Sequence, residues 1–223
     1  MIQLDGAAWL VDNIAGTLIK NDIIKYTNYK DLQLKLVDIA ILNAKIKNLG
    51  RFNNIGKEYC LVSLLALNDA SLNSFYTDEK RNIGVIGTDI IAAGEDNKKY
   101  FTDYIDSGRS LGRGNMFVYT LPSTPLGEVA IVNKLIGPII YYNFLKKPLK
   151  NLMLQSEILL LDDQYEGMTL LFNDETGKIC FVVSKKDSTA PSSKYNFQKL
   201  IAAVDKNDDV KSLVNYLDTY KEL

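Results

Sequence analysis

Hydrophobic and polar positions along the chain predict strands that alternate with helices. Partial alternation over residues 2–10 predicts a first strand, and dense aliphatic residues over 32–46 predict a helix. A broad apolar face over residues 56–67 predicts a second helix that is almost completely buried. Residues 82–86 predict a short buried strand, which ends in a glycine-bearing turn at residues 87–89.

The middle of the chain continues the same alternation. Helical spacing predicts helices over residues 95–105 and 125–135, the latter closed by Gly137 and Pro138, and residues 139–142 predict a strand. Residues 148–161 predict a helix with eight large apolar side chains and only two charges. Such a helix exposes at most a thin stripe to water, so we expect protein on both sides of it.

The last third predicts a hairpin and two amphipathic helices. Strands over residues 167–172 and 179–183 flank a turn at 173–177. A polar loop over 184–194 separates them from the two final helices, each of which has one apolar stripe. The stripe residues are Phe197, Leu200, Ile201 and Val204 in the first helix, and Val210, Leu213, Val214, Leu217 and Tyr220 in the second.

The element order, β-α-β-α-β-α-β-β followed by two helices, predicts an α/β fold. We expect a mixed sheet with helices on both faces, mainly parallel, in which the terminal hairpin adds an antiparallel edge. Residues 1–223 are interpreted as a single domain. Residues 1–184 form its sheet-containing unit and 185–223 form a loop and helical extension.

Composition places the chain among globular proteins with one sizeable core. It has 223 residues, of which 47% are hydrophobic and 24% charged, and 26 basic against 27 acidic residues give a net charge of -1. No basic excess indicates a nucleic-acid or membrane partner. The N-terminus lacks the pattern of a signal peptide, and two cysteines suit a reducing compartment, so a cytoplasmic location is expected.

The sequence contains no histidine, which excludes many catalytic mechanisms. Serine–histidine and cysteine–histidine chemistry, histidine metal ligation and imidazole proton relays all need that side chain. Cys60 and Cys180 lie inside apolar elements and are interpreted as structural residues. Acidic residues in turns are typically solvated, so no metal site or cofactor is expected.

Several short motifs, in order and spacing, resemble the N-terminal half of the β-ketoacyl synthases, within the thiolase-like fold. The matching pieces fall within about residues 2–183, and each piece alone is weak. They are Gly50–Phe52, Ile83–Thr88, Phe117–Pro122, Leu126–Ile131, Gly137–Pro138 and Glu166–Gly167.

The chain departs from this family at the catalytic position. Active ketosynthases place a cysteine at the start of the buried helix, where the helix dipole stabilises its thiolate. Counting from Pro138 and back from Glu166 puts Lys146 there. The family's two histidines and its lysine belong to a second half that no segment here matches, so the resemblance implies a catalytically silent protein. A lysine can act as a nucleophile, but Lys146 beside Lys147 favours a cationic surface patch.

The resemblance also implies a dimer and a role for the loop after residue 115. Ketosynthases pair through their N-terminal halves, and this loop reaches toward the partner's acyl pocket. We therefore expect an acyl-pocket or dimer-interface role for the loop residues, and an inactive active-site corner before the buried helix. The loop residues are Met116, Phe117, Tyr119, Thr120 and Leu121, and the corner residues are Asn143, Phe144 and Lys146.

Two functions follow from these expectations. The first is a non-catalytic subunit that pairs with an active ketosynthase and limits its product length, similar to the chain-length-factor subunits of aryl-polyene, polyketide or fatty-acid pathways. The alternative is a stand-alone homodimer that binds acyl chains or an acyl-carrier protein, which is also a candidate partner in the first case. In either case the helix at 148–161 needs a cover, which the two C-terminal helices or a partner can supply.

Overall fold

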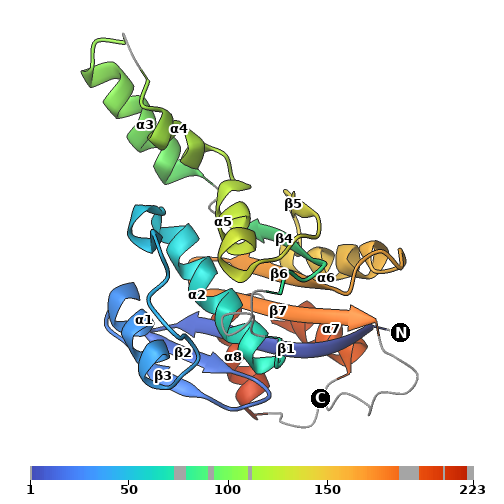
Figure 1. The fold of residues 1–223 in the computed structure, drawn as a ribbon. Coiled ribbons are helices and arrows are strands. Elements are labelled where there is room, and N and C mark those ends of the chain that lie inside the picture. The colour runs from blue at the N-terminus through green and yellow to red at the C-terminus, as the bar shows by residue number, and fades with distance from the viewer. Residues whose placement is uncertain are drawn as a thin grey trace.

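The computed structural model describes residues 2–72, 79–89, 93–109, 112–185, 196–207 and 209–219. Its centre is a seven-stranded sheet with the order β3-β2-β1-β7-β6-β4-β5 (Figure 1). The strands are β1 (Ile2–Val11), β2 (Ile14–Thr17), β3 (Ile23–Lys25), β4 (Ile83–Asp89), β5 (Ile139–Tyr141), β6 (Gly167–Asn173) and β7 (Lys178–Lys185).

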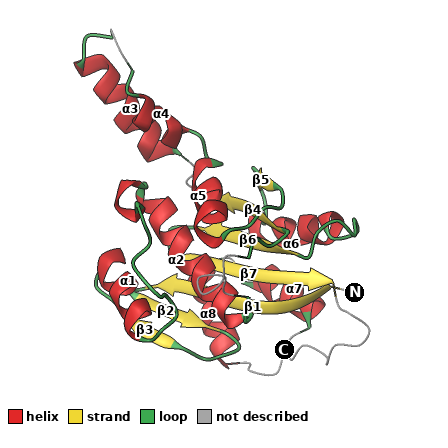
Figure 2. Ribbon diagram, viewed as in Figure 1, coloured by secondary structure: helices red, strands yellow, loops and turns green. Residues whose placement is uncertain are grey.

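Helices cover both faces of this sheet, which confirms the expected α/β class with a mixed sheet (Figure 2). One face carries α1 (Tyr29–Asp38), α2 (Asn54–Asp69) and α5 (Thr124–Asn133), and the other carries α6 (Pro148–Leu159), α7 (Phe197–Lys206) and α8 (Val210–Thr219). Side chains of the central strands alternate between the two layers. Leu170 and Phe181 pack on the α6 side, whereas Leu171 and Cys180 pack on the α2 side.

The sheet is less parallel than the alternation of elements predicted. Among these strands only the pairings of β4 with β5 and with β6 are parallel, and every other pairing is antiparallel. The expectation that the terminal hairpin forms an edge was wrong, because β7 pairs with β1 from Ile2↔Lys185 to Leu10↔Lys178. The hairpin therefore lies in the middle of the sheet, where both strands are buried on both faces.

Three local expectations also need correction. The helix predicted over 32–46 spans Tyr29–Asp38, because Ala40 adopts a left-handed conformation (φ 57°) that ends it. Residues 87–89 continue strand β4 and form no turn. The short strands β2 and β3 were not predicted, since four and three residues are too few to show a period.

A helical arm projects from one end of the sheet-containing body (Figure 1). We call it the α3–α4 arm, and it consists of α3 (Gly94–Asp106), α4 (Gly114–Phe117), the 3₁₀ turn η3 (Val118–Thr120) and the C-cap residue Leu121. None of its described residues is fully buried. An aromatic group holds it together, with Tyr100 near both Tyr104 and Phe117 at ring-centroid distances of 6.4 and 5.7 Å.

The C-terminal helices join the layer of α6 and do not cover its outer surface. α7 packs beside α6, and both α7 and α8 contact β1 from the same side. On α6 and just after it, Leu154, Ile158 and Leu161 remain 37%, 58% and 75% exposed. The prediction that this helix exposes at most a thin stripe was therefore wrong for the single chain.

Candidate functional site

The segment before α6 corresponds to the catalytic position suggested by the sequence. Lys146 is exposed, and its backbone carbonyl accepts a hydrogen bond from Asn151 Nδ2 at 2.8 Å. Asn143 is exposed as well, while Phe144 is half-buried and stacks on Tyr142 with ring centroids 5.3 Å apart. These residues present no acid, base or nucleophile in a shared enclosure.

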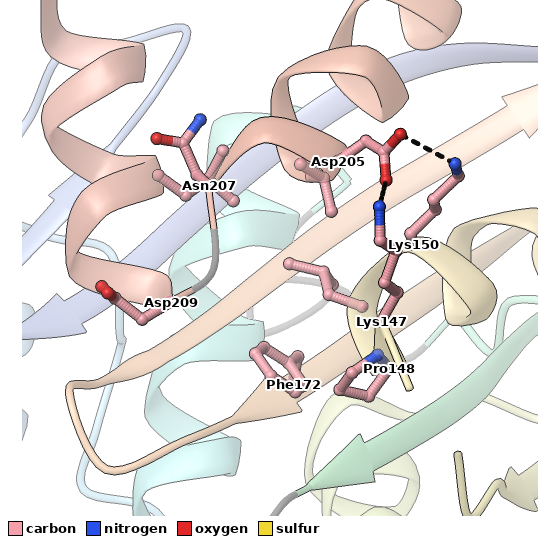
Figure 3. A pocket seen from close by; sticks show the side chains of 10 residues that line it. Lys147, Pro148, Lys150, Phe172, Asp205, Asn207 and Asp209 are labelled. Carbon is pink, nitrogen blue, oxygen red and sulfur yellow. Dashed lines mark hydrogen bonds and ion pairs between the residues drawn. The ribbon is translucent and has the colours of Figure 1, made fainter. Parts of the chain in front are cut away.

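The C-terminal helices of the chain itself lie next to the start of α6. Lys147 and Lys150 both form ion pairs with Asp205 of α7, the second at 3.0 Å (Figure 3). Hydrogen bonds from the two lysines lower the pKa of the Asp205 carboxyl. The expected cationic patch of Lys146, Lys147 and Lys150 is therefore only partly neutralised, because two of these lysines share one carboxylate.

A cavity of about 130 Å³ lies next to this ion-pair cluster, between α6, β6, α7 and α8 (Figure 3). Its lining mixes apolar side chains from the core with the charged cluster and two further polar residues. The lining residues are Lys147, Pro148, Leu149, Lys150, Phe172, Val204, Asp205, Asn207, Asp209 and Leu213. The cavity is small for an acyl chain, since ligand pockets usually enclose several hundred Å³.

Neither thiol has the environment of a reactive nucleophile. Cys60 and Cys180 are fully buried, and both are free. Burial raises the pKa of each thiol well above its ordinary value, so neither forms a thiolate near neutral pH. This environment agrees with the structural role inferred from the sequence.

The predicted loop residues belong to the α3–α4 arm, on the α5 side of the molecule. Phe117 and Leu121 are 50% and 48% exposed, whereas Met116, Tyr119 and Thr120 are half-buried. The loop contacts α5, whereas Phe144, two positions before Lys146, packs with the core cluster on the opposite face of the sheet. The role of the loop in an acyl pocket or interface stays a prediction.

Sequence reasoning missed a polar cluster that ties this loop to the body. Tyr119 Oη lies 2.7 Å from Glu128 Oε1 on α5 and 3.1 Å from the backbone oxygen of Arg51. Burial raises the pKa of Glu128 to about 7 and, together with the hydrogen bond to Glu128, raises the pKa of Tyr119. One signal in the sequence could have indicated this cluster: Glu128 is a single glutamate at a core-facing position of the otherwise apolar helix α5.

The edge of the sheet at β5 exposes apolar side chains. No described strand pairs with the outer edge of β5, and three isoleucines on the adjacent segment are strongly exposed. Ile131 on α5 is 80% exposed, Ile136 is 59% exposed and Ile139 on β5 is 45% exposed. An open strand edge flanked by apolar side chains is typical of a surface that another chain covers.

Within the described ranges, no cluster of three or more metal-ligating side chains occurs. The same ranges contain no helix that is long and apolar enough to cross a membrane.

Comparison with known proteins finds the same fold in ketosynthases. A structure described as the ishigamide ketosynthase/chain length factor aligns with 84% of this chain and 63% of its own, at a TM-score of 0.59 and 9% identity. A β-ketoacyl synthase from Burkholderia phymatum STM815 aligns with 83% of this chain and 59% of its own, at a TM-score of 0.55 and 11% identity. This chain thus spans less than two thirds of either structure.

These similarities establish a thiolase-like fold of the kind found in β-ketoacyl synthases, as the sequence motifs suggested. No protein-family model matches the sequence, and the search of curated proteins gives no match. At such low identity the likeness defines the fold, and function has to be argued from the chain's own residues.

Proposed function

We propose that this chain is a catalytically silent ketosynthase-like subunit that pairs with an active β-ketoacyl synthase. In this role it helps to shape the acyl tunnel of its partner, as a chain length factor does, in fatty-acid or polyene-type polyketide synthesis. The observation that carries the proposal is that Lys146, the residue to which the spacing of the sequence motifs assigns the nucleophile position, is an exposed lysine in a chain with a ketosynthase-like fold.

Several features support catalytic silence. No histidine occurs in the 223 residues, and both thiols are buried with a raised pKa. Lys147 and Lys150 form ion pairs with Asp205, next to the position that the sequence spacing predicts for the nucleophile. Acyl transfer needs a nucleophile within reach of a base, and the described residues around α6 offer no such pair.

The β5 edge supports pairing with another protein. Edge strands with exposed apolar side chains favour association, because a partner strand can use the open backbone groups while the side chains leave water. Because Ile136 and Ile139 are about half exposed, burying the rest of these side chains contributes roughly 1 kcal/mol each. The arm residues Phe117 and Leu121 offer further apolar surface on the α5 side of the molecule.

Co-expression with an active ketosynthase from the same organism tests the pairing. Size-exclusion chromatography with mass determination is expected to show a one-to-one complex. Ile139→Lys is expected to disrupt the complex while leaving the melting temperature of the chain alone unchanged. Ile23→Lys is the matched control, since Ile23 is 57% exposed on β3 at the opposite edge of the sheet.

A homodimer that ignores the ketosynthase would contradict the proposal and favour the alternative. In that case the chain would be a stand-alone protein that binds acyl chains or an acyl-carrier protein. An increase of the melting temperature on addition of an acyl chain, or a complex with the carrier protein in the absence of a synthase, would then identify its ligand.

A further inference from the structure

Two side-chain contacts next to the first turn of α2 help to attach the α3–α4 arm to the body. The first contact involves Asn53, the N-cap residue of α2. Its side-chain oxygen accepts the backbone N–H of Gly56 at 2.7 Å, and its amide nitrogen donates to Asp96 Oδ2 at 2.7 Å. Asp96 lies in the first turn of α3, so this contact holds the beginning of the arm.

The second contact holds the end of the arm. Tyr119 of η3 brings its hydroxyl oxygen to 2.7 Å from Glu128 Oε1 and to 3.1 Å from the carbonyl oxygen of Arg51. A phenol has one proton, so it donates fully to only one of these two oxygens. Both distances are satisfied at once if Glu128 is protonated, because Glu128 then donates to Tyr119 while Tyr119 donates to Arg51.

The surroundings of Glu128 favour this neutral form. The residue is 8% exposed, and its Oε2 atom has no hydrogen-bond partner among the described residues. Oε2 lies directly against Gly56, where an added Cβ would approach it to 2.1 Å. An ionised carboxylate in that place would keep one oxygen without a donor, which is costly in a buried site.

The groups that face Glu128 compensate such a charge only in part. The hydrogen bond with Tyr119 and the charge of Lys57 lower the pKa of Glu128, but by less than burial raises it. Lys57 and Cys60 face it from α2, Tyr119 from η3, and Asp96 acts on Tyr119 from α3. Lys57 has its ammonium group 4.7 Å from the ring centroid of Tyr29, and the described residues include no ion pair to Glu128. Burial accordingly raises the pKa of Glu128 to about 7.

We infer that Glu128 is a positioning residue: in its neutral form it fixes the α3–α4 arm through Tyr119, and loss of its proton releases the arm. Release admits water to the carboxylate, which the closed arrangement excludes. This inference deepens the proposed function, because the same arm carries Phe117 and Leu121, the residues expected to meet the partner. The position of the arm, and with it pairing, would then respond to pH.

Hydrogen–deuterium exchange of the full chain alone tests the inference. Peptides from the arm are compared between the wild type and Glu128→Gln at the same pH, so that the intrinsic pH dependence of exchange cancels. Glutamine keeps the shape and the donor of the neutral acid. We expect the ratio of wild-type to variant exchange in the arm to rise by about tenfold or more between pH 5 and pH 7, and to level off by pH 8. Peptides from β6 and β7 should show a constant ratio.

Two further variants distinguish the contact between Tyr119 and Glu128 from the general packing of the arm. Tyr119→Phe removes the shared hydroxyl and should make arm exchange faster than in the wild type at pH 5. Tyr104→Phe is the control, because it removes another arm hydroxyl while keeping the stacked ring on Tyr100. It should exchange like the wild type at each pH.

An exchange ratio that stays constant from pH 5 to pH 8 would overturn the inference. Equal effects of Tyr119→Phe and Tyr104→Phe on arm exchange would also overturn it. The experiment needs no ketosynthase, so its failure is distinguishable from failure of the proposed function. If a complex forms, its affinity should fall from pH 5 to pH 7 for the wild type and stay unchanged for Glu128→Gln.

Discussion

Asp174, in the turn between β6 and β7, accepts a hydrogen bond from the backbone N–H of Val210 at 2.8 Å. Thirty-six positions separate the two residues in sequence. The same carboxylate also accepts the N–H groups of Thr176 and Gly177, and Thr176 Oγ1 in turn accepts the N–H of Lys211. The central hairpin therefore caps the N-terminus of α8, which makes the C-terminal helices part of the same folded unit.

Removal of this cap should destabilise the whole domain. Asp174→Ala leaves buried N–H groups of the turn and of α8 without an acceptor, so we expect a loss of about 3 kcal/mol in the free energy of unfolding. Urea denaturation measures it. Glu175→Ala, at the exposed neighbouring position of the same turn, is the control and should change the free energy by less than about 0.5 kcal/mol. Equal effects of the two variants would contradict the capping role.

Two glycines in helices should respond to alanine with opposite signs. Gly56 lies against Glu128 Oε2, and Gly56→Ala should destabilise by about 1–3 kcal/mol because the added methyl group displaces that carboxyl. Gly127, one position before Glu128 in α5, has open space around it. Gly127→Ala should therefore stabilise by about 0.5–1 kcal/mol through helix propensity. Thermal unfolding of the two variants compares the signs directly, and stabilisation by Gly56→Ala would refute the close contact.

The raised pKa of Glu128 predicts a pH dependence of global stability. The unfolded chain releases this proton near pH 4.5, whereas the folded protein holds it up to about pH 7. Because the folded state binds more protons in that window, stability contributed by Glu128 is fully present below pH 4.5 and is lost as the pH rises to about 7. The difference in free energy of unfolding between the wild type and Glu128→Gln should change across this window and stay constant above pH 8. Urea denaturation at four pH values measures this difference. A difference that does not change with pH would show that Glu128 has the pKa of an ordinary glutamate.

Phe117 is the arm residue whose loss should affect a complex most directly. It is 50% exposed, and its ring makes an edge contact with Tyr100. If the proposed function holds, Phe117→Ala should either weaken binding to the ketosynthase or shift the length of its product. Leu145→Ala, at a position that is 95% exposed and away from the arm, is the comparison and should do neither. Unchanged affinity together with an unchanged product profile would remove Phe117 from the predicted interface.

The pattern of apolar positions was sufficient to predict the long elements. Helices such as α2 and α6 and the hairpin strands β6 and β7 are determined by periods of 3.6 and 2 over many residues, which local sequence shows directly. The motifs around Gly137 likewise indicated the fold from residues in order, and comparison of structures confirms that fold. The assignment of Lys146 to a nucleophile position stays a prediction from the same spacing.

Only the tertiary structure decided where these elements lie and which distant residues meet. Strand order depends on pairing partners far apart in sequence, so nothing local indicated that β7 pairs with β1 and that the hairpin is central. The ion pairs of Lys147 and Lys150 with Asp205 and the contact of Tyr119 with Glu128 arise because packing brings separate segments together. The burial that raises the pKa of Glu128 follows from that packing, since one glutamate in a sequence has no defined environment until the chain folds around it.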